Sequence, residues 1–254
     1  MKVKAKKHLG QHFLKDEFCA KRIVDSYLER KKNKMLLEIG PGTGVLTKYI
    51  LGESHEDFLA FDVDKESIEF LNTNFPKHQG QFIEKDFLSA DLISLCGKSF
   101  DIIGNFPYNI SSQIMFRVWD YRNNIDVVVG MFQKEVAQRI ASKPGTKDYG
   151  ILSVLLQAFF DIEYMFTVQP GAFQPPPKVK SGVIRLIRNK IQQLNCDEEL
   201  FKKVVKTAFN QRRKTLRNAL KQMNEKKIDH PLLDKRAEQL GVYDFIEITR
   251  LLQY

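Results

Sequence analysis

The sequence predicts an α/β fold in which a largely parallel sheet carries an antiparallel pair of strands at one edge, followed by a small all-α domain. Two observations lead to this prediction. Apolar runs of strand length alternate with stretches of helical spacing up to about residue 158, and from about residue 195 only helical spacing remains. Continuous apolar strands alternating with helices are typical of parallel sheets covered on both faces.

The first part of the chain contains five apolar runs that we predict to be parallel strands. These are MLLEIG (35–40), DFLAFD (57–62), QFIEKD (81–86), FDIIGN (100–105) and DVVVGMF (126–132). Residues 45–52, 65–75 and 111–122 lie between them and show the apolar periodicity of helices. The order strand, helix, strand predicts right-handed crossovers and helices on both faces of the sheet.

The next segment breaks this alternation. FFDIEYMFTVQ (159–169) and SGVIRLIR (181–188) are two strand-like runs with no helix between them, which predicts an antiparallel pair at the sheet edge. QPPPK (174–178) between them is too rich in proline for a helix or a central strand. Four short helices are then expected at 197–211, 213–224, 231–241 and 243–254. We therefore predict two domains, 1–192, which begins with a basic segment at 1–15, and 193–254.

Charge is distributed unevenly along the chain. The formal net charge is +9, yet residues 1–170 hold 22 Lys and Arg against 22 Asp and Glu, whereas residues 171–254 hold 18 against 9. A basic cluster, MKVKAKK, also opens the chain. Such asymmetry favours contact with a polyanion, most often nucleic acid, over a merely solvated basic surface.

The remaining composition narrows the class of protein. The three cysteines are isolated, so we expect neither a disulfide framework nor a metal site, and a reducing, cytoplasmic setting fits. A secretory signal would need an apolar run after the basic start, and the sequence has none there. ILSVLLQAFF, the longest apolar stretch, is too short to span a bilayer, and no membrane partner is expected.

Three features at the ends of successive strands predict a nucleoside pocket. LEIGPGTGVLT places Gly40 and Gly42 directly after the first strand, where glycine lets the backbone turn and approach a ligand. Asp62 ends the second strand and suits ribose hydroxyls, and Asp86 ends the third and suits an adenine amino group. Asp62 is preferred to Asp64, which already starts the next helix and suits its N-cap. Asp86 has an alternative role as a helix cap, and the glycines alone fit a simple tight turn.

The cofactor expected in this pocket is S-adenosylmethionine. The glycine spacing is G-x-G-x-G, which differs from the dinucleotide fingerprint, and the Gly-Lys-Ser/Thr of a P-loop is absent. No Lys or Arg of this region is placed for a pyrophosphate. These features favour a phosphate-free adenosine cofactor over NAD.

Seven motifs together resemble one known family, the ribosomal RNA small-subunit adenine-N6,N6-dimethyltransferases. They are GQHFL (10–14), EIGPGTGVLT (38–47), NFPYNISS (105–112), FQKEVAQRI (132–140), YGILSVLLQ (149–157), FQPPPKVKSGVIRL (173–186) and AFNQRRKTLRNAL (208–220). The resemblance covers nearly the whole chain. It implies that residues 1–192 form a domain with a Rossmann-like class I methyltransferase sheet that binds S-adenosylmethionine. It also implies that residues 193–254 form a helical domain that binds RNA.

The motif NFPY carries the expected chemistry. The lone pair of an adenine amino group is delocalised into the ring, which makes it a poor nucleophile. We predict that the Asn105 side-chain oxygen and the Pro107 carbonyl accept its hydrogens and steer the lone pair toward the methyl sulfonium. Tyr108 stacks on the base. The resemblance adds Phe173 as the aromatic on the other face of the base; the alternative is an ordinary core Phe.

The resemblance also implies cofactor contacts. His12 and the Leu14 backbone touch the cofactor from the GQHFL segment, together with Gly40, Gly42, Asp62, Asp86 and Asn105. Three positions depart from the family pattern: His12 where many members have Asn, Asp62 where Glu is usual, and Phe106 where Leu is common.

The RNA surface is expected on the basic helical part. Residues 202–227 carry ten Lys and Arg against one Glu. Arg212, Arg213, Lys214 and Arg217 are predicted on neighbouring turns of one helix, where they contact phosphates. The lysines at 2, 4, 6 and 7 are expected to be mobile and to order on RNA.

The function predicted from these features is dimethylation of two adjacent adenosines in a loop near the 3′ end of small-subunit (16S) rRNA, within a partly assembled subunit, by a monomer. Because a base held between two rings must be unpaired or extruded, a loop is a suitable substrate. Three alternatives stay open: the large-subunit enzyme of macrolide resistance, a non-catalytic RNA-binding assembly factor, and a DNA adenine methyltransferase. The intact NFPY and glycine loop disfavour the second alternative.

Overall fold

A computed structural model describes residues 3–52, 57–224 and 227–253, and the chain divides into two compact units. The first unit comprises Met1–Ala137 and Ile162–Arg188, and the second comprises Gln138–Asp161 and Asn189–Tyr254. The second unit resumes at Asn189 and continues to the end of the chain, so this crossing lies close to the boundary expected at residue 192. Residues 138–161, which we had placed with the sheet, group instead with the C-terminal helices, because the apolar helix α7 (Ile151–Gln157) packs on α8 (Glu198–Asn210).

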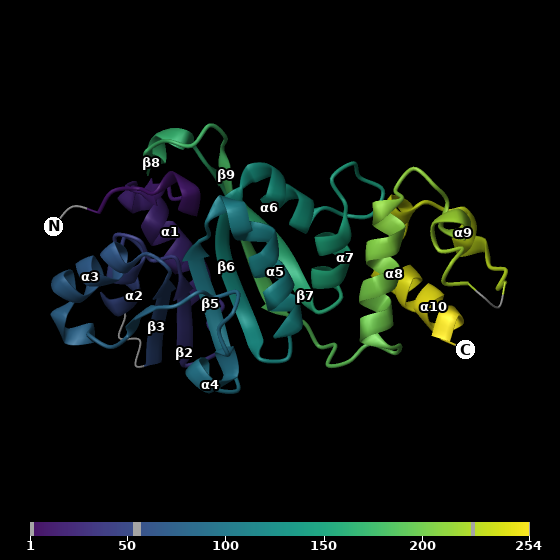
Figure 1. The fold of residues 1–254 in the computed structure, drawn as a ribbon, viewed down its shortest axis with the longest axis horizontal. Helices are drawn as coiled ribbons and strands as arrows, with labels where there is room; N and C mark the ends of the chain where they lie inside the picture. The colour runs from purple at the N-terminus through teal and green to yellow at the C-terminus, as the bar shows by residue number, and fades with distance from the viewer. Residues whose placement is uncertain (1–2, 53–56, 225–226, 254) are drawn as a thin grey trace. The chain divides into compact units, whose positions relative to one another are not determined.

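A seven-stranded sheet forms the first unit (Figure 1). Its order is β4 (Phe82–Glu84), β3 (Asp57–Asp62), β2 (Met35–Ile39), β5 (Phe100–Asn105), β6 (Ile125–Gln133), β9 (Ser181–Arg188) and β7 (Phe160–Val168). The strands from β4 to β6 are parallel, and β9 runs antiparallel to β6. The predicted α/β class with a class I methyltransferase sheet and an antiparallel edge is therefore confirmed.

Helices cover both faces of this sheet, as the continuous apolar strands required. They are α1 (Glu17–Leu28), α2 (Thr47–Gly52), α3 (Lys65–Asn74), α4 (Leu92–Cys96), α5 (Ser111–Asp120) and α6 (Lys134–Ala141). On one face α1, α2 and α3 join Leu36, Phe58 and Val129 of the strands in one apolar cluster. Leu37 and Val128 alternate with these side chains, point to the opposite face of the sheet and are equally buried. On that face α5 crosses in front of the strands in Figure 1.

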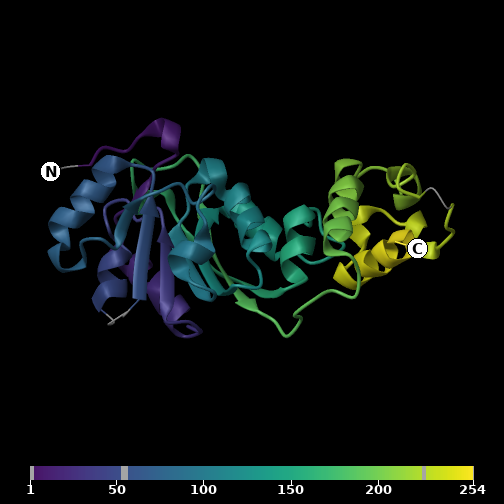
Figure 2. The same cartoon turned by 60° about the horizontal axis from the view of Figure 1, so that its bottom comes forward.

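A second, two-stranded sheet ties the N-terminal segment to the loop before β9. β1 (Phe13–Leu14) pairs antiparallel with β8 (Phe173–Gln174), and the purple N-terminal segment and green β8 lie side by side in Figures 1 and 2. We call residues 3–16 the N-terminal strap. The Ala172 carbonyl accepts the backbone N–H groups of Lys15 and Asp16, which continues this attachment. The strap is therefore a structured part of the first unit.

The second unit is helical, but less so than predicted. α7, α8 and α10 (Val242–Gln253) pack together, and Tyr149, Phe209 and Phe245 form a chain of ring contacts among them. The expected helix at 213–224 is only α9 (Leu216–Ala219), and that at 231–241 is two 3₁₀ turns, Pro231–Asp234 and Ala237–Gln239. The helix prediction was wrong there because Thr215 bridges to Arg236 and the Leu216 N–H bonds to the Lys235 carbonyl, which holds both segments extended.

Among the helices that the structure describes, none is long and apolar enough to cross a membrane.

Candidate active site

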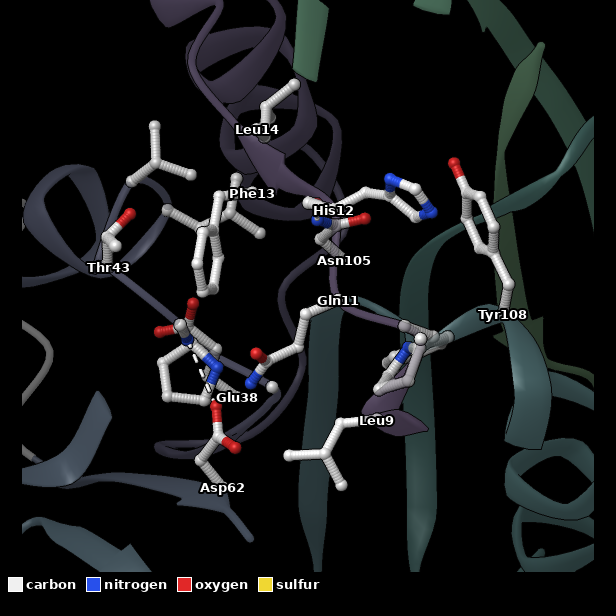
Figure 3. A pocket seen from close by; sticks show the side chains of 18 of the residues that line it. Leu9, Gln11, His12, Phe13, Leu14, Glu38, Thr43, Asp62, Asn105 and Tyr108 are labelled. Atoms are coloured by element: carbon white, nitrogen blue, oxygen red, sulfur yellow. Dashed lines mark hydrogen bonds between the residues drawn. The ribbon is translucent and has the colours of Figure 1, made fainter. Parts of the chain in front are cut away.

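A cavity lies at the carboxyl ends of the parallel strands, under the strap. The strap contributes Leu9 to Leu14, the segment after β2 contributes Gly40 to Thr43, and Glu38, Asp62 and the NFPY residues complete the wall (Figure 3). Parallel strands bring their carboxyl ends to one sheet edge, which is why residues far apart in the sequence meet here.

The glycine loop forms one wall and requires glycine on conformational grounds. Gly40 and Gly42 have φ of +68° and +55°, a region that residues with a Cβ rarely adopt. A Cβ on Gly42 would also lie 2.9 Å from the Phe13 ring of the strap. The loop and the strap therefore fit together only because residue 42 has no side chain.

Two buried carboxylates face the cavity, Asp62 as predicted and Glu38, which we had not singled out. Asp62 is 8 % exposed; its oxygens accept N–H groups from Gly42 at 3.2 Å and Asp64 at 2.9 Å. Glu38 is 1 % exposed and accepts the Thr47 hydroxyl at 2.7 Å. Burial raises the pKa of Asp62, and burial, reinforced by the charge of Asp62, raises the pKa of Glu38 to about 8. Neither acid has a cationic partner among the described residues.

The strap is fastened at Asp64, the N-cap of α3. The Asp64 side chain accepts the Glu66 N–H, as the sequence suggested for this residue, and also bonds Lys6 Nζ at 2.6 Å and Gln11 Nε2 at 3.0 Å. Lys6 was expected to be mobile, and this prediction was wrong because its ammonium pairs with Asp64 and Glu66. Lys4 and Lys7 are exposed, whereas Lys2 lies outside the described residues.

Asn105 ends β5 at the cavity and is oriented by the strap. Its Nδ2 donates to the His12 carbonyl at 3.0 Å. The amide oxygen is therefore the end of the side chain that remains for a ligand. Phe106 follows with its ring packed over Gly104 and Gly130, where a Cβ would lie 2.6 Å and 2.3 Å from that ring. The departure from Leu at this position is thus accommodated by glycines on two neighbouring strands.

The two carbonyls of the turn differ in their hydrogen bonding. The Pro107 carbonyl accepts the Ile110 N–H at 3.3 Å and the Ser111 hydroxyl at 3.0 Å, so both lone pairs are used within the turn. The Phe106 carbonyl accepts no hydrogen bond from the residues that the structure describes, while Phe106 lines the cavity. This geometry favours the carbonyl of residue 106, rather than that of Pro107, as an acceptor for a ligand.

Tyr108 is half-buried beside the cavity. Its ring stacks on the His12 imidazole, with centroids 5.4 Å apart and planes inclined by 30° (Figure 3). His12 Nδ1 donates to the Pro175 carbonyl at 2.8 Å, so the imidazole joins the strap to the loop after β8. The Tyr108 hydroxyl bonds the buried Ser181 hydroxyl at 2.5 Å, and burial raises the pKa of Tyr108, which keeps the phenol neutral.

Two predicted site residues do not line the cavity. Asp86 is exposed and its carboxylate accepts the Leu88 N–H at 2.9 Å, so it caps a turn rather than the helix that we had kept as its alternative. Phe173 is 1 % exposed and belongs to the apolar cluster, paired with Leu14 in the small sheet. The other cavity residues named from the sequence are brought together: His12, Leu14, Gly40, Gly42, Asp62, Asn105, Pro107 and Tyr108.

The basic residues of the second unit are not on one helix. Arg212, Arg213 and Lys214 lie in the turn after α8, and only Arg217 is in α9. Arg212 donates to the Lys147 carbonyl at 2.7 Å and faces Glu238, while Arg217 pairs with Asp229 and Asp234 at 2.8 Å. Arg213 and Lys214 are exposed and form no ion pair with any residue that the structure describes.

Sequence reasoning missed Glu38, Gln11, Phe13 and Ser181 as residues of this region. Glu38 had a signal, an acid inside the apolar run MLLEIG, because an ionisable group in a doubly buried strand needs a reason. Gln11 and Phe13 belong to the quoted motif GQHFL without a stated reason. Ser181 belongs to the quoted motif FQPPPKVKSGVIRL, again without a stated reason, because its partner Tyr108 is distant in the sequence.

The cavity suits S-adenosylmethionine chemically. Carboxylates without cationic partners can accept hydrogen bonds from ribose hydroxyls and attract a positively charged ligand. Neither Lys nor Arg is among the lining residues, which disfavours a pyrophosphate. Acceptor oxygens and an aromatic ring stand beside the carboxylates, as transfer to a planar base would require.

Comparison with known proteins gives a consistent result. The family model for ribosomal RNA adenine dimethylase matches residues 2–253. Ribosomal RNA small subunit methyltransferase A of Cytophaga hutchinsonii is 58 % identical over 253 residues, covering 99 % of this chain and 98 % of that protein. The protein of the same name from Parabacteroides distasonis is 54 % identical, covering 99 % and 95 %.

Solved structures agree on the fold. A dimethyladenosine transferase from Plasmodium falciparum matches with a TM-score of 0.79 at 23 % identity, covering 95 % of this chain and 98 % of that one. The 23S rRNA methyltransferase ErmE matches with 0.66 at 24 % identity, covering 94 % and 99 %. The chain therefore belongs to the ribosomal RNA adenine dimethylase family, whose members methylate rRNA adenine with S-adenosylmethionine as the methyl donor.

Proposed function

We propose that this protein dimethylates two adjacent adenosines in a loop near the 3′ end of small-subunit rRNA, on a partly assembled subunit. The observation that supports this most is the cavity in which an oriented Asn105 amide, the Phe106 carbonyl and the Tyr108 ring adjoin two buried carboxylates. The sequence identity to small subunit methyltransferases supports the choice of substrate.

In the proposed mechanism the chain orients an amine rather than removing its proton. S-adenosylmethionine, when bound, supplies a methyl group activated by a sulfonium. The Asn105 Oδ1 and the Phe106 carbonyl accept the two amino hydrogens of adenine, which favours a tetrahedral nitrogen whose lone pair is no longer delocalised into the ring. Because the alkylated nitrogen is strongly acidic, its proton leaves to water. In a second cycle one of the two oxygens accepts the remaining amino hydrogen and a second methyl group is transferred.

The cofactor is held by groups of the first unit. Asp62 accepts the ribose hydroxyls with the lone pairs that its two backbone bonds leave over. Gly40, Gly42 and the strap residues His12 and Leu14 enclose it and exclude water. Asp86 is proposed for the cofactor's adenine amino group, which requires it to exchange the Leu88 N–H for that donor.

The target base is proposed to stack on Tyr108, with Phe173 on its other face. Since His12 lies 5.4 Å from Tyr108, centroid to centroid, a base does not fit between those two rings, and the imidazole must move aside. Exposure of Phe173 requires the small sheet of β1 and β8 to open. Binding of the base thus involves the strap, and Arg213 and Lys214 are proposed to contact phosphates of the same RNA.

A methylation assay tests the proposal directly. Small subunits lacking the modification should accept close to four methyl groups from tritiated cofactor by resemblance to the family, and primer extension should stop at two adjacent adenosines of the small-subunit rRNA. A stop on large-subunit rRNA instead would favour the macrolide-resistance enzyme. Absence of heat on titration with S-adenosylmethionine would favour the assembly factor. We further propose that the protein acts as a monomer in the cytoplasm; its three cysteines are free.

A further inference from the structure

Tyr108 bears a hydroxyl group that stacking on a base does not require. A phenylalanine ring offers nearly the same face to an adenine, and aromatic stacking on bases tolerates either ring. Among the described residues this hydroxyl has one hydrogen-bond partner, the Ser181 hydroxyl at 2.5 Å. The face of the Tyr108 ring stacks on the His12 imidazole.

Ser181 is on a rigid element. It begins β9, lies opposite Gln133 of β6 in the antiparallel register, and is 0 % exposed. The Lys180 carbonyl before it accepts the Lys134 N–H at 2.9 Å, which fixes the start of the strand. A side chain on a strand with neighbours on both sides, as β9 has, is placed more accurately than one on a loop.

Tyr108, in contrast, lies on a short 3₁₀ turn, Tyr108–Ile110, after a proline. Its ring carries two torsions beyond this turn, and its stacking partner, the His12 imidazole, must move when a base arrives. The hydrogen bond to Ser181 then still restrains the direction of the ring.

We infer that Ser181 is a positioning residue for methyl transfer: its hydroxyl holds the Tyr108 ring in the orientation on which the target adenine stacks. This inference rests on the proposed function and adds to it a residue that acts through Tyr108 without touching substrate. Within the described part of the chain, the hydroxyl of Tyr108 bonds Ser181 alone. Loss of either hydroxyl therefore has the same consequence, a ring that rotates away from the stacking orientation.

A double-mutant cycle on the full-length enzyme tests this inference. Ser181→Ala and Tyr108→Phe should each lower kcat/KM for undermethylated small subunits about three- to tenfold, the range of one ordinary hydrogen bond. The double variant should be no worse than either single one, since removing both partners leaves no unsatisfied group. Ser181→Thr, which keeps the hydroxyl, should recover much of the activity.

The cofactor serves as the internal control. The affinity for S-adenosylmethionine, measured by calorimetry, and the melting temperature should stay close to those of the wild type in Ser181→Ala and Ser181→Thr, because Ser181 does not line the cofactor cavity. Losses that multiply in the double variant would overturn the inference, as would a fully active Ser181→Ala. An inactive wild-type enzyme would instead overturn the proposed function, so the two failures are distinguishable.

Discussion

The cavity of the first unit and the basic surface of the second unit treat charge in opposite ways. Around the cavity, Glu38 and Asp62 are buried, no described Lys or Arg forms an ion pair with either, and desolvation raises the pKa of each carboxyl. On the second unit the half-buried Arg212 and the exposed Arg217 are bonded to acids or carbonyls of their own unit. The buried acids are thus poised for a cationic ligand, whereas half of the predicted RNA-binding cations already serve the local fold.

This contrast shows that a cation on the expected surface is not necessarily free to bind a phosphate. A cation contributes to binding a phosphate mainly when it releases no partner in doing so, because exchange of one ion pair for another in water gains little. Arg213 and Lys214 meet that condition among the described residues, and Arg212 and Arg217 do not. The four predictions below test each side of this comparison.

The largest effect is expected from Tyr108→Ala. Removing the ring abolishes the stacking platform and should lower kcat/KM for small subunits about a hundredfold. Cofactor affinity should change less than about threefold, because the glycine loop and Asp62 are untouched. Methyl incorporation and calorimetry measure the two quantities. Near wild-type turnover in this variant would remove Tyr108 from the mechanism.

Charge reversal at Arg213 and Lys214 should have the next largest effect. Affinity for small-subunit rRNA should fall about tenfold or more, and the slope of log K against log salt should become shallower by about two, because each of these cations is proposed to neutralise one phosphate. Binding is measured over a salt series. The matched control is the double reversal at Arg30 and Lys31, two cations of the first unit outside the proposed surface; an equal slope change there would argue against a specific role for 213 and 214.

A smaller effect concerns pH and Glu38. With the pKa of Glu38 raised to about 8 by burial, this carboxyl is mostly protonated at neutral pH in the cofactor-free enzyme. A cationic ligand favours its ionised form, so binding of S-adenosylmethionine should release protons, and affinity should rise roughly tenfold from pH 6 to pH 8 and then level off.

Calorimetry in buffers of different ionisation enthalpy counts the protons released on binding. Glu38→Gln should release fewer and should bind with a flatter pH profile, since its amide does not titrate. S-adenosylhomocysteine, whose sulfur is neutral, should show a weaker pH dependence in the wild type. An identical profile in Glu38→Gln would assign the dependence to another group.

The smallest effect is expected from Arg217→Ala. Its ion pairs with Asp229 and Asp234 are exposed, and exposed pairs contribute little to stability. The melting temperature should fall by no more than a few degrees, and the loss should shrink at high salt, because screening already weakens the pairs in the wild type. An RNA-binding loss as large as that of the 213/214 variant would show that Arg217 also contacts phosphate.

The sequence allowed the sheet and much of the cavity to be predicted, because both follow from topology. Once 35–40, 57–62 and 100–105 are parallel neighbours, Gly40, Asp62 and Asn105 must meet at one edge. The helices at 213–224 and 231–241 were predicted wrongly because their apolar spacing also suits short turns held by tertiary contacts, here the bridge from Thr215 to Arg236.

Contacts between segments that are distant in the sequence could not be predicted either, because no local pattern indicates them. Nothing near Tyr108 in the sequence indicates Ser181, and nothing in GQHFL indicates that Gln11 bonds Asp64. The burial of Phe173 likewise depends on the pairing of β8 with β1, which two residues on each side create. Such short ladders carry no periodic signal.

The small sheet of β1 and β8 has a consequence for how the enzyme matures and how it is handled. Its two strands come from opposite ends of the first unit's sequence, so a nascent chain has no closed cofactor compartment until residue 174 has left the ribosome. The N-terminus is equally a working part, since Lys6 is anchored on α3. Removal of residues 3–14 would therefore take away both the Lys6 anchor and part of the cavity wall.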